Sequence, residues 1–133
     1  MVNENLKCLL IDDDIDDQDI FQIAVNELNR KIQCFFFNNG IDALRRLQDD
    51  FPVPDIIFLD MNMPRMNGLQ CLKEMKTIPR LQQTPVILFS TSSDKELLSE
   101  SKIFGAKEFL VKPSSIQELS SKLYEIFHAL FGI

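Results

Sequence analysis

The sequence predicts an α/β protein in which a doubly wound, five-stranded parallel sheet is covered by five helices. Short apolar runs alternate five times with segments whose apolar residues recur every three or four positions, which is the alternation of strand and helix in such folds. The apolar runs are nearly continuous, as expected for strands that helices cover on both faces. All strands of a parallel sheet end at one edge, so the residues that follow them can converge there.

The first half of the chain contains two strand–helix units. An apolar strand is expected over residues 6–11, and apolar residues at helical spacing predict a helix from Asp16 to about Arg30. The second strand, over 32–37, is followed by the turn-forming run Asn38-Asn39-Gly40. A helix comes next, with apolar residues at Ile41, Ala43, Leu44 and Leu47.

The second half contains three further units. Prolines interrupt the chain before a strand over 56–60, and Gly68 opens the third helix. A fourth strand is expected over 86–89, followed by a helix that includes Phe104 and ends at Gly105. A fifth strand, over residues 108–111, leads into the last helix, whose apolar residues are Ile116, Leu119, Leu123, Ile126, Phe127 and Leu130.

Length and composition indicate the class of protein. A chain of 133 residues fits one domain, residues 1–133, and we expect no output domain. The hydrophobic content of 45% is enough for one well-filled core. The net charge of −6 argues against nucleic acid as a partner, because nonspecific binding depends on Lys and Arg that neutralise phosphates.

Targeting signals and cysteine usage indicate a cytoplasmic protein. No apolar run is long enough to span a bilayer, and residues 1–7 lack the charged start and apolar middle of a signal peptide. We therefore expect no membrane partner. Thiols stay reduced in the cytoplasm, so Cys8, Cys34 and Cys71 are interpreted as small core residues. The single histidine, His128, is interpreted as a surface residue of the last helix.

Polar side chains follow four of the predicted strands. Asp60 ends the third strand, Asp12-Asp13-Asp14 follow the first, Ser90 follows the fourth and Lys112 the fifth. Crowded carboxylates repel one another unless a cation joins them, and Mg²⁺ prefers one or two carboxylates with water and phosphate oxygens. Lys112 and Ser90 can donate hydrogen bonds to a phosphoryl group. The pattern predicts a magnesium site beside an aspartate that can form an acyl phosphate.

Each of these residues also has a simpler interpretation. The acids of residues 12–14 suit the start of the following helix, and capping is our interpretation of Asp16 or Asp17. The lysine after the fifth strand fits an ordinary surface residue. The hydroxyl residues after the fourth strand fit an N-cap for the fourth helix, a role we assign to Ser92 or Ser93. The position of all these groups at strand ends favours the magnesium site.

The chain resembles the receiver domain of bacterial two-component response regulators over nearly its whole length. The resemblance implies the flavodoxin-like strand order 2-1-3-4-5. It also implies a phosphoacceptor protein of a two-component or phosphorelay system, with slow self-dephosphorylation at most and no turnover as an enzyme. The resemblance rests on Asp12-Asp13, on Asp60 with Met63-Pro64 and Gly68, on Pro85 through Thr91, on Gly105-Ala106 and on Lys112-Pro113.

The resemblance assigns roles at the expected metal and phosphoryl site. Asp60 would accept a phosphoryl group from a sensor histidine kinase or a histidine phosphotransfer protein. Asp13 and Asp60 would bind Mg²⁺, or Mn²⁺, directly. Asp12 would act through water, and the backbone carbonyl of Asn62 would be a further ligand.

The resemblance also assigns a conformational switch. Lys112 would pair with the phosphoryl group, Ser90 would move toward it, and Phe109 would rotate inward. Pro113 would follow a cis peptide bond. The change would reach an unknown downstream protein through the face formed by the fourth helix, the fifth strand and the fifth helix. We expect a monomer, or a weak dimer that depends on phosphorylation.

Other classes of protein fit less of the sequence. An inert receiver-like interaction module would use none of the acceptor chemistry. A phosphatase of the haloacid-dehalogenase type also uses a strand-end aspartate, magnesium and lysine, but it needs a second aspartate where Asn62 stands. A flavin or nucleotide binder needs a loop rich in Gly, Ser or Thr after the first strand. A calcium loop starting at Asp12 would place Asp17 at the glycine position and Ile23 at the terminal acid.

Overall fold

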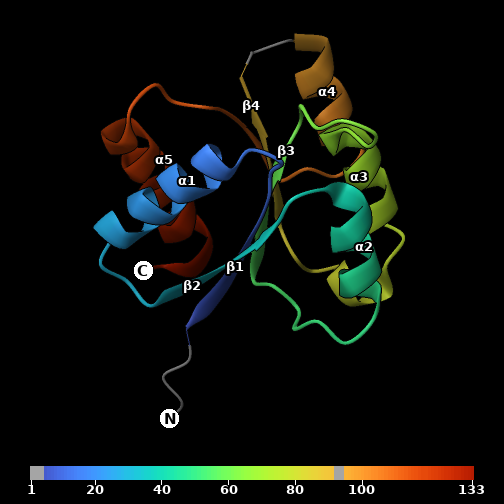
Figure 1. Cartoon of the computed structure of the whole chain (residues 1–133), viewed down its shortest axis with the longest axis horizontal. Coiled ribbons are helices and arrows are strands. Elements are labelled where there is room, and N and C mark those ends of the chain that lie inside the picture. Colours follow the sequence, from blue (N-terminus) through green and yellow to red (C-terminus); the bar gives the residue numbers. More distant parts are fainter. Residues whose placement is uncertain (1–4, 92–94) are drawn as a thin grey trace.

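The structure is a computed structural model that describes residues 5–91 and 95–133. Within these residues, five strands form one sheet in the order β2-β1-β3-β4-β5. All neighbouring strands are parallel, and helices lie on both sides of the sheet (Figure 1). The predicted doubly wound α/β class and the strand order 2-1-3-4-5 are therefore confirmed.

Strands and helices alternate along the chain, and each strand is followed by a helix. Because the strands are parallel, their C-terminal ends all lie on the same side of the molecule, at the top of Figure 1. The strands are β1 (Leu6–Ile11), β2 (Ile32–Phe37), β3 (Ile56–Asp60), β4 (Val86–Ser90) and β5 (Glu108–Val111). The helices are α1 (Ile15–Glu27), α2 (Gly40–Gln48), α3 (Gly68–Met75), α4 (Lys95–Ile103) and α5 (Ile116–Phe131), with a short 3-10 turn, η1 (Pro79–Leu81), before β4.

The core has two layers, one on each face of the sheet. Helices α1 and α5 cover one face, and α2, α3 and α4 lie on the other (Figure 1). Neighbouring residues of a strand point to opposite layers: Phe58 packs with α1 and α5, whereas Leu59 packs with α2 and α3. The ring of Phe58 lies edge-on to that of Phe21 at 5.1 Å between centroids. Burial on both faces explains why the strands are continuously apolar.

The C-terminal end of a central strand carries a buried carboxylate. Every residue of β3 and β4 is buried, including Asp60 at the end of β3. Helix α1, after β1, and helix α3, after β3, lie on opposite faces (Figure 1). The loops after β1 and β3 line a pocket at the strand ends, which is where open α/β sheets bind ligands.

Two helices end earlier than the sequence predicts. Helix α1 stops at Glu27, before the expected end near Arg30, and Asn29 has a left-handed φ of 52° that turns the chain toward β2. Phe104 lies just beyond α4, followed by Gly105 with a φ of 96°. Both differences arise from the local backbone conformation after the last helical turn.

The N-cap of α1 also differs from the prediction. Asp14 is the cap, and its side chain accepts hydrogen bonds from the backbone N–H groups of Asp16 and Asp17. The side chains of Asp16 and Asp17 are therefore not the cap itself but lie in the first turn. The predicted cap of α4, Ser92 or Ser93, lies outside the described residues.

The predictions on the three cysteines and on His128 agree with the structure. Cys8 and Cys71 are buried and Cys34 is half-buried, and all three belong to the apolar layers. His128 is exposed on α5 and stacks on Tyr124. Among the described helices, none has both the length and the apolar composition needed to cross a membrane.

Gly68 lets the start of α3 approach the end of β3. Its N–H donates to the carbonyl oxygen of Met61, at 3.3 Å. A Cβ atom here would lie 2.6 Å from the carbonyl oxygen of Asp60 and 2.8 Å from Cα of Met61. Since backbone atoms of the site cannot yield as a flexible side chain can, this close approach requires glycine.

Replacing Gly68 with alanine should lower the free energy of unfolding by about 1 to 3 kcal/mol through this overlap. Gly40→Ala is the matched control, because Gly40 also begins a helix and its added Cβ would meet side-chain sulfur atoms at 3.1 and 3.2 Å instead of backbone atoms. The control should change stability by less than about 1 kcal/mol. Urea denaturation of both variants measures the difference, and equal losses would contradict the close approach at Gly68.

Candidate functional site

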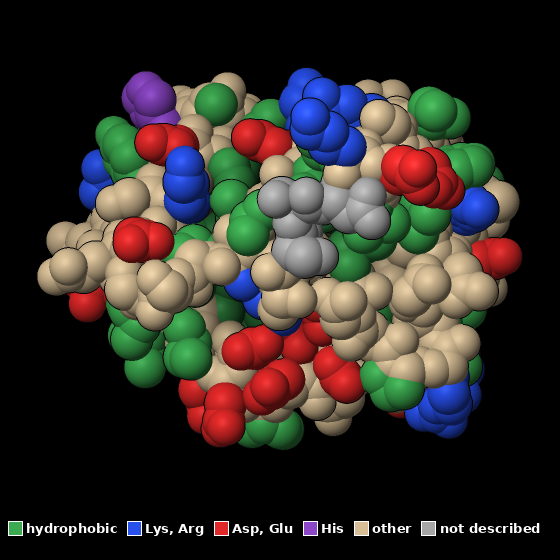
Figure 2. Space-filling model, turned by 90° about the horizontal axis from the view of Figure 1, so that it is seen from above, with side chains coloured by type: hydrophobic (Ala, Val, Ile, Leu, Met, Phe, Trp, Pro, Cys, Tyr) green, Lys and Arg blue, Asp and Glu red, His purple; other side chains and the backbone are tan. Residues whose placement is uncertain are grey.

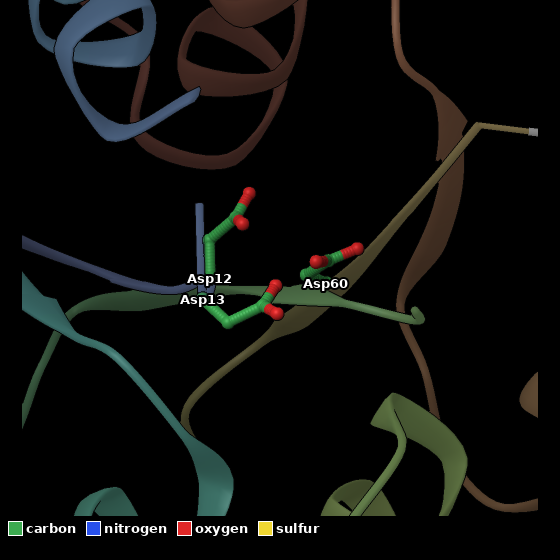
Figure 3. Close-up of side chains that lie close together, drawn as sticks. All are labelled: Asp12, Asp13 and Asp60. Atoms are coloured by element: carbon green, nitrogen blue, oxygen red, sulfur yellow. The ribbon is translucent and has the colours of Figure 1, made fainter. Parts of the chain in front are cut away.

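Three carboxylates converge where β1 and β3 end. Asp12 and Asp13 follow β1, and Asp60 is the last residue of β3. One carboxylate oxygen from each lies within 4.8 Å of the others, and Figure 3 shows the side chains of Asp13 and Asp60 directed toward the same space. The register of the sheet accounts for this, because Ile11 pairs with Leu59, so the residues that follow them lie side by side. The predicted convergence of the acids is confirmed.

The site lies at the bottom of a shallow pocket. Asp12 and Asp60 are buried, with 0% and 2% of their surface exposed, whereas Asp13 is exposed. Figure 2 views the molecule from this edge of the sheet and shows acidic side chains gathered on it. The pocket has a volume of about 510 Å³ and is lined by Asp13, Asp14, Ile15, Asp17, Asp60, Asn62, Thr91 and Lys112.

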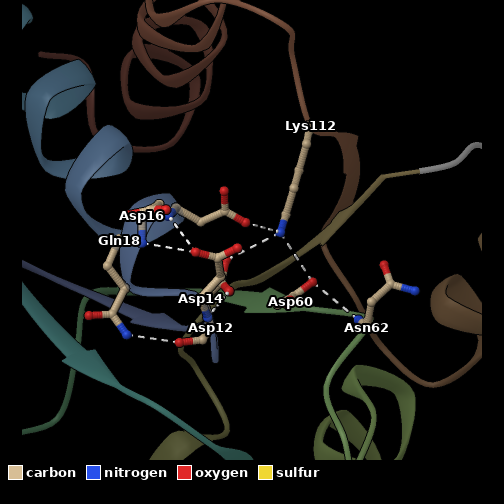
Figure 4. Close-up of polar contacts among 8 residues, drawn as sticks. Asp12, Asp14, Asp16, Gln18, Asp60, Asn62 and Lys112 are labelled. Atoms are coloured by element: carbon tan, nitrogen blue, oxygen red, sulfur yellow. Dashed lines mark hydrogen bonds and ion pairs between the residues drawn. The ribbon is translucent and has the colours of Figure 1, made fainter.

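Lys112 reaches the acidic cluster from the end of β5 (Figure 4). Its ammonium donates to Asp17 at 2.9 Å and to Asp12 at 3.2 Å. It also forms an ion pair with Asp60 at 3.4 Å. The ammonium lies 5.5 Å from the centroid of the Phe89 ring, and only 15% of the side chain is exposed. An ordinary surface lysine would extend into solvent, so that interpretation is wrong.

Backbone hydrogen bonds fix the orientation of the two buried carboxylates. The N–H of Asp14 donates to Asp12 at 3.0 Å, and the N–H of Asn62 donates to Asp60 at 3.1 Å (Figure 4). The amide of Gln18 on α1 donates to the backbone carbonyl of Asp12 at 2.8 Å. These bonds hold the loops after β1 and β3 in place, so the carboxylates are positioned before any ligand arrives.

Burial and charge shift the protonation of the two central groups. Burial raises the pKa of Asp12 to about 7, and the charge of Asp60 adds to this rise, while the N–H of Asp14 and the charge of Lys112 oppose it. Burial by itself would lower the pKa of Lys112. The hydrogen bond to Asp17 and the charges of Asp12 and Asp60 outweigh burial and raise this pKa above its usual range. Lys112 is therefore a permanent cation at neutral pH.

The donor set suits a hard divalent cation. Three carboxylates and one ammonium leave an excess of negative charge in a partly buried pocket, and a cation relieves it. All three candidate ligands offer oxygen, as Mg²⁺ requires. The acids alone would leave open positions for water or for the oxygens of a bound phosphoryl group.

Two other predicted residues lie close to this site. Ser90 ends β4, is completely buried, and accepts the N–H of Lys112 at its backbone carbonyl, at 2.6 Å. Phe109 is half-buried on β5 and packs against the apolar layer formed with α2 and α3. The structure therefore places Ser90 beside the pocket and Phe109 on the neighbouring strand, in register with Leu88.

The prediction of a cis peptide bond before Pro113 is wrong. No cis peptide bond occurs among residues 5–91 and 95–133, so the Lys112–Pro113 bond is trans. The trans isomer of a bond before proline is favoured by about 0.5 to 1 kcal/mol. The ammonium of Lys112 reaches Asp12 and Asp60 with the trans bond, so the observed contacts do not require the less favourable isomer.

Sequence reasoning missed the role of Asp17 in this site. The sequence indicates a capping role for Asp16 or Asp17, but the carboxylate of Asp17 makes the shortest contact of the Lys112 ammonium. The signal was present, because the first turn of the helix after β1 begins at the same edge as the strand ends. What the sequence could not show is that α1 places Asp17, and not Asp16, toward β5.

The fold and the site together define a flavodoxin-like protein with an acidic, lysine-containing pocket at its sheet edge. The family model of the response regulator receiver domain matches residues 8–124. Chemotaxis protein CheY-3 of Vibrio cholerae is 30% identical over 137 residues, covering 98% of each chain. Sporulation initiation phosphotransferase F of Bacillus subtilis is 35% identical over 107 residues, covering 79% of this chain and 83% of that protein.

A solved structure agrees with these relatives. The manganese-bound form of response regulator Rcp1 has a TM-score of 0.82 and 24% sequence identity, covering 96% of both chains, which supports the fold. This chain belongs to the response regulator receiver domain family. Receiver domains are signalling proteins that accept phosphoryl groups in two-component systems, interact with histidine kinases or phosphotransfer proteins, and bind a divalent metal at an acidic cluster.

The raised pKa of Asp12 predicts how pH affects the metal-free protein. The folded state holds this proton more tightly than the unfolded chain does, so the free energy of unfolding should fall as pH rises from about 4 to about 7. The loss is on the order of 3 kcal/mol. Urea denaturation across this range, without divalent metal, measures it.

Asp12→Asn is the control for this pH effect, because it removes the titrating group and keeps its shape. The variant should lack the additional loss of stability toward pH 7. Millimolar Mg²⁺ should restore stability to the unmodified protein near pH 7, since it binds only the assembled acids. The same pH dependence in both proteins would show that Asp12 does not titrate as expected.

Proposed function

We propose that Asp60 accepts a phosphoryl group from a phosphohistidine of a sensor histidine kinase or a histidine phosphotransfer protein. A carboxylate oxygen of Asp60 attacks phosphorus, the bond between phosphorus and the imidazole nitrogen breaks, and the imidazole keeps the electron pair. The observation that carries this proposal is the position of Asp60. It is buried at a strand end, 3.4 Å from the ammonium of Lys112 and next to two further carboxylates.

The acidic cluster would hold the divalent metal that this transfer needs. We assign Asp13 and Asp60 as direct ligands, Asp12 as a ligand through water, and the backbone carbonyl of Asn62 as a further ligand. A bound Mg²⁺, or Mn²⁺, neutralises the charge that builds up on the phosphoryl oxygens. Asp13 is exposed and lines the pocket, which leaves a path for the ion, whereas Asp12 is buried.

Lys112 and Ser90 would stabilise the phosphoryl group after transfer. The ammonium of Lys112 already lies among the acids and supplies a positive charge that needs no proton exchange at neutral pH. The hydroxyl of Ser90 is at the buried end of β4, on the strand next to Asp60. Both groups donate hydrogen bonds, which the dianionic phosphoryl group requires.

The signal would leave through the surface of α4, β5 and α5. Movement of Ser90 toward the phosphoryl group opens space that Phe109 fills, so one covalent event selects between two packings. Two elements of this surface expose an apolar side chain: Ile103 on α4 is 77% exposed and Val111 on β5 is 42% exposed. Exposed apolar groups on adjoining elements suit a protein partner.

The wider role proposed here is that of a receiver domain acting in the cytoplasm without an output domain in residues 1–133. The chain would work as a monomer, or as a weak dimer after phosphorylation. It would act as a protein-binding output or as a shuttle of a relay. Neither nucleic acid nor membrane is proposed as a partner, given the net charge of −6.

A turnover phosphatase is the weaker alternative. The residue two positions after Asp60 is Asn62, whose amide cannot serve as the acid and base that rapid hydrolysis needs. We therefore assign slow self-dephosphorylation at most. Hydrolysis of p-nitrophenyl phosphate at the rate of a dedicated phosphatase would contradict this assignment, and a protein that never accepts a phosphoryl group would be the inert interaction module.

Acetyl phosphate should label Asp60 when Mg²⁺ is present. Intact mass spectrometry should show one added phosphoryl group, and peptide mapping should place it on Asp60. Asp60→Asn should take up none, because an amide is not a nucleophile toward phosphorus, and chelation of the metal should abolish labelling of the unmodified protein. Labelling that persists in the variant at the same level would place the acceptor elsewhere.

Beryllofluoride with Mg²⁺ should shift backbone amide signals along α4, β5 and α5. The reason is that an acyl-phosphate mimic at Asp60 draws Ser90 and Lys112 toward it and changes the packing of Phe109. NMR spectra should show the largest shifts over residues 95–127 and at the pocket, with small shifts in α2. The Asp60→Asn protein should show no such pattern, and unmoved signals over 95–127 would disprove this route.

A further inference from the structure

Lys112 is held by a residue that the acceptor chemistry does not use. Its ammonium contacts three carboxylates, at 2.9 Å for Asp17, 3.2 Å for Asp12 and 3.4 Å for Asp60. Hydrogen bonds are formed with Asp17 and Asp12, whereas the contact with Asp60 is an ion pair at longer distance. The proposed acceptor is therefore the most distant of the three partners of Lys112.

Asp17 comes from a different part of the fold than the other two acids. It lies in the first turn of α1, whereas Asp12 and Asp60 lie at strand ends. Its side chain is 36% exposed, so it sits at the rim of the pocket and not at its base. Asp17 therefore attracts the ammonium toward α1, at the rim.

The hydrogen bond to Asp17, at 2.9 Å, is the shortest contact of the Lys112 ammonium with a carboxylate among the described residues. An ammonium has three donors, and the ammonium of Lys112 already faces three carboxylates, those of Asp17, Asp12 and Asp60. A phosphoryl group on Asp60 would bring new acceptor oxygens, and those oxygens compete with Asp17 for the same ammonium.

We propose that Asp17 is a positioning residue that draws the ammonium of Lys112 toward α1 in the unphosphorylated protein and competes with the phosphoryl group for that ammonium. The inference rests on the proposed role of Lys112 as the partner of that group. The consequence is that Asp17 weakens the phosphorylated state relative to the unphosphorylated one. It thereby sets how readily the site takes and keeps a phosphoryl group.

The exposure of Asp17 limits the size of this effect. Partly exposed ion pairs contribute modestly because water screens them, which corresponds to about a twofold to fivefold change in an equilibrium constant. Removing Asp17 should therefore strengthen binding of an acyl-phosphate mimic by about twofold to fivefold. Such a change is large enough to measure and small enough to leave the fold intact.

Asp16 provides a matched control for Asp17. Both are aspartates in the first turn of α1, and the backbone N–H of each donates to the side chain of Asp14. The side chain of Asp16 is exposed, and the carboxylates that pair with Lys112 in the described part of the chain are Asp12, Asp17 and Asp60. Neutralising either residue removes one negative charge from the same helix turn, but only Asp17 holds Lys112.

The experiment measures beryllofluoride affinity at saturating Mg²⁺ for the unmodified protein and for Asp17→Asn, Asp17→Ala, Asp16→Asn and Asp16→Ala. Magnesium affinity without beryllofluoride and the melting temperature are measured in parallel. Both Asp17 variants should bind beryllofluoride about twofold to fivefold more tightly, and the alanine variant should show the larger gain because asparagine can still accept a hydrogen bond. The Asp16 variants should change it by less than about 1.5-fold, since water screens their more distant charge.

The outcomes distinguish failure of the inference on Asp17 from failure of the proposed function. Equal gains at both positions would mean that general charge, and not the contact with Lys112, is responsible, and the inference would be overturned. Unchanged or weaker binding in the Asp17 variants would overturn it as well, since Asp17 would then be neutral or helpful. Failure of the unmodified protein to bind beryllofluoride with Mg²⁺ would instead disprove the proposed function itself.

Discussion

Repulsion among carboxylates at the C-terminal end of the sheet is the physical constraint on which the properties of the site depend. Parallel pairing of β1 with β3 places Asp12, Asp13 and Asp60 within 4.8 Å of one another, and two of them are buried. Such an arrangement is unfavourable by itself: burial, and to a smaller extent the charge of Asp60, raise the pKa of Asp12. The apolar layers on both faces of the sheet offset this, and the single ammonium of Lys112 reduces the repulsion without removing it.

An incompletely neutralised site is suited to reversible signalling. The pocket retains an excess of negative charge, which a divalent cation would relieve, and the oxygens of a phosphoryl group could complete the ligands of that cation. In the proposed mechanism Lys112, which faces the acids, would pair with the phosphoryl oxygens after transfer. Its contact with Asp17 would then adjust the balance between the two states.

The fold can be predicted from the sequence because each strand and helix has its own local hydrophobic pattern, and the alternation of the two repeats five times. Strands β1, β2, β3 and β5 have the predicted bounds, and β4 is one residue longer because Ser90 pairs with Val111. Helix ends were less predictable: the left-handed conformation of Asn29 and the end of α4 before Phe104 depend on single backbone torsions. The same holds for the trans bond before Pro113, which resemblance to a family had suggested to be cis.

The sequence by itself determined that the acids, a hydroxyl and a lysine stand at the ends of parallel strands, since strand periodicity and chain order fix which edge they reach. The tertiary structure decided which of them touch. The preference of Lys112 for Asp17 over Asp60 follows from the packing direction of α1 against the sheet. That direction is set by core side chains such as Phe21 and Phe58, so the sequence of the loop alone does not predict it.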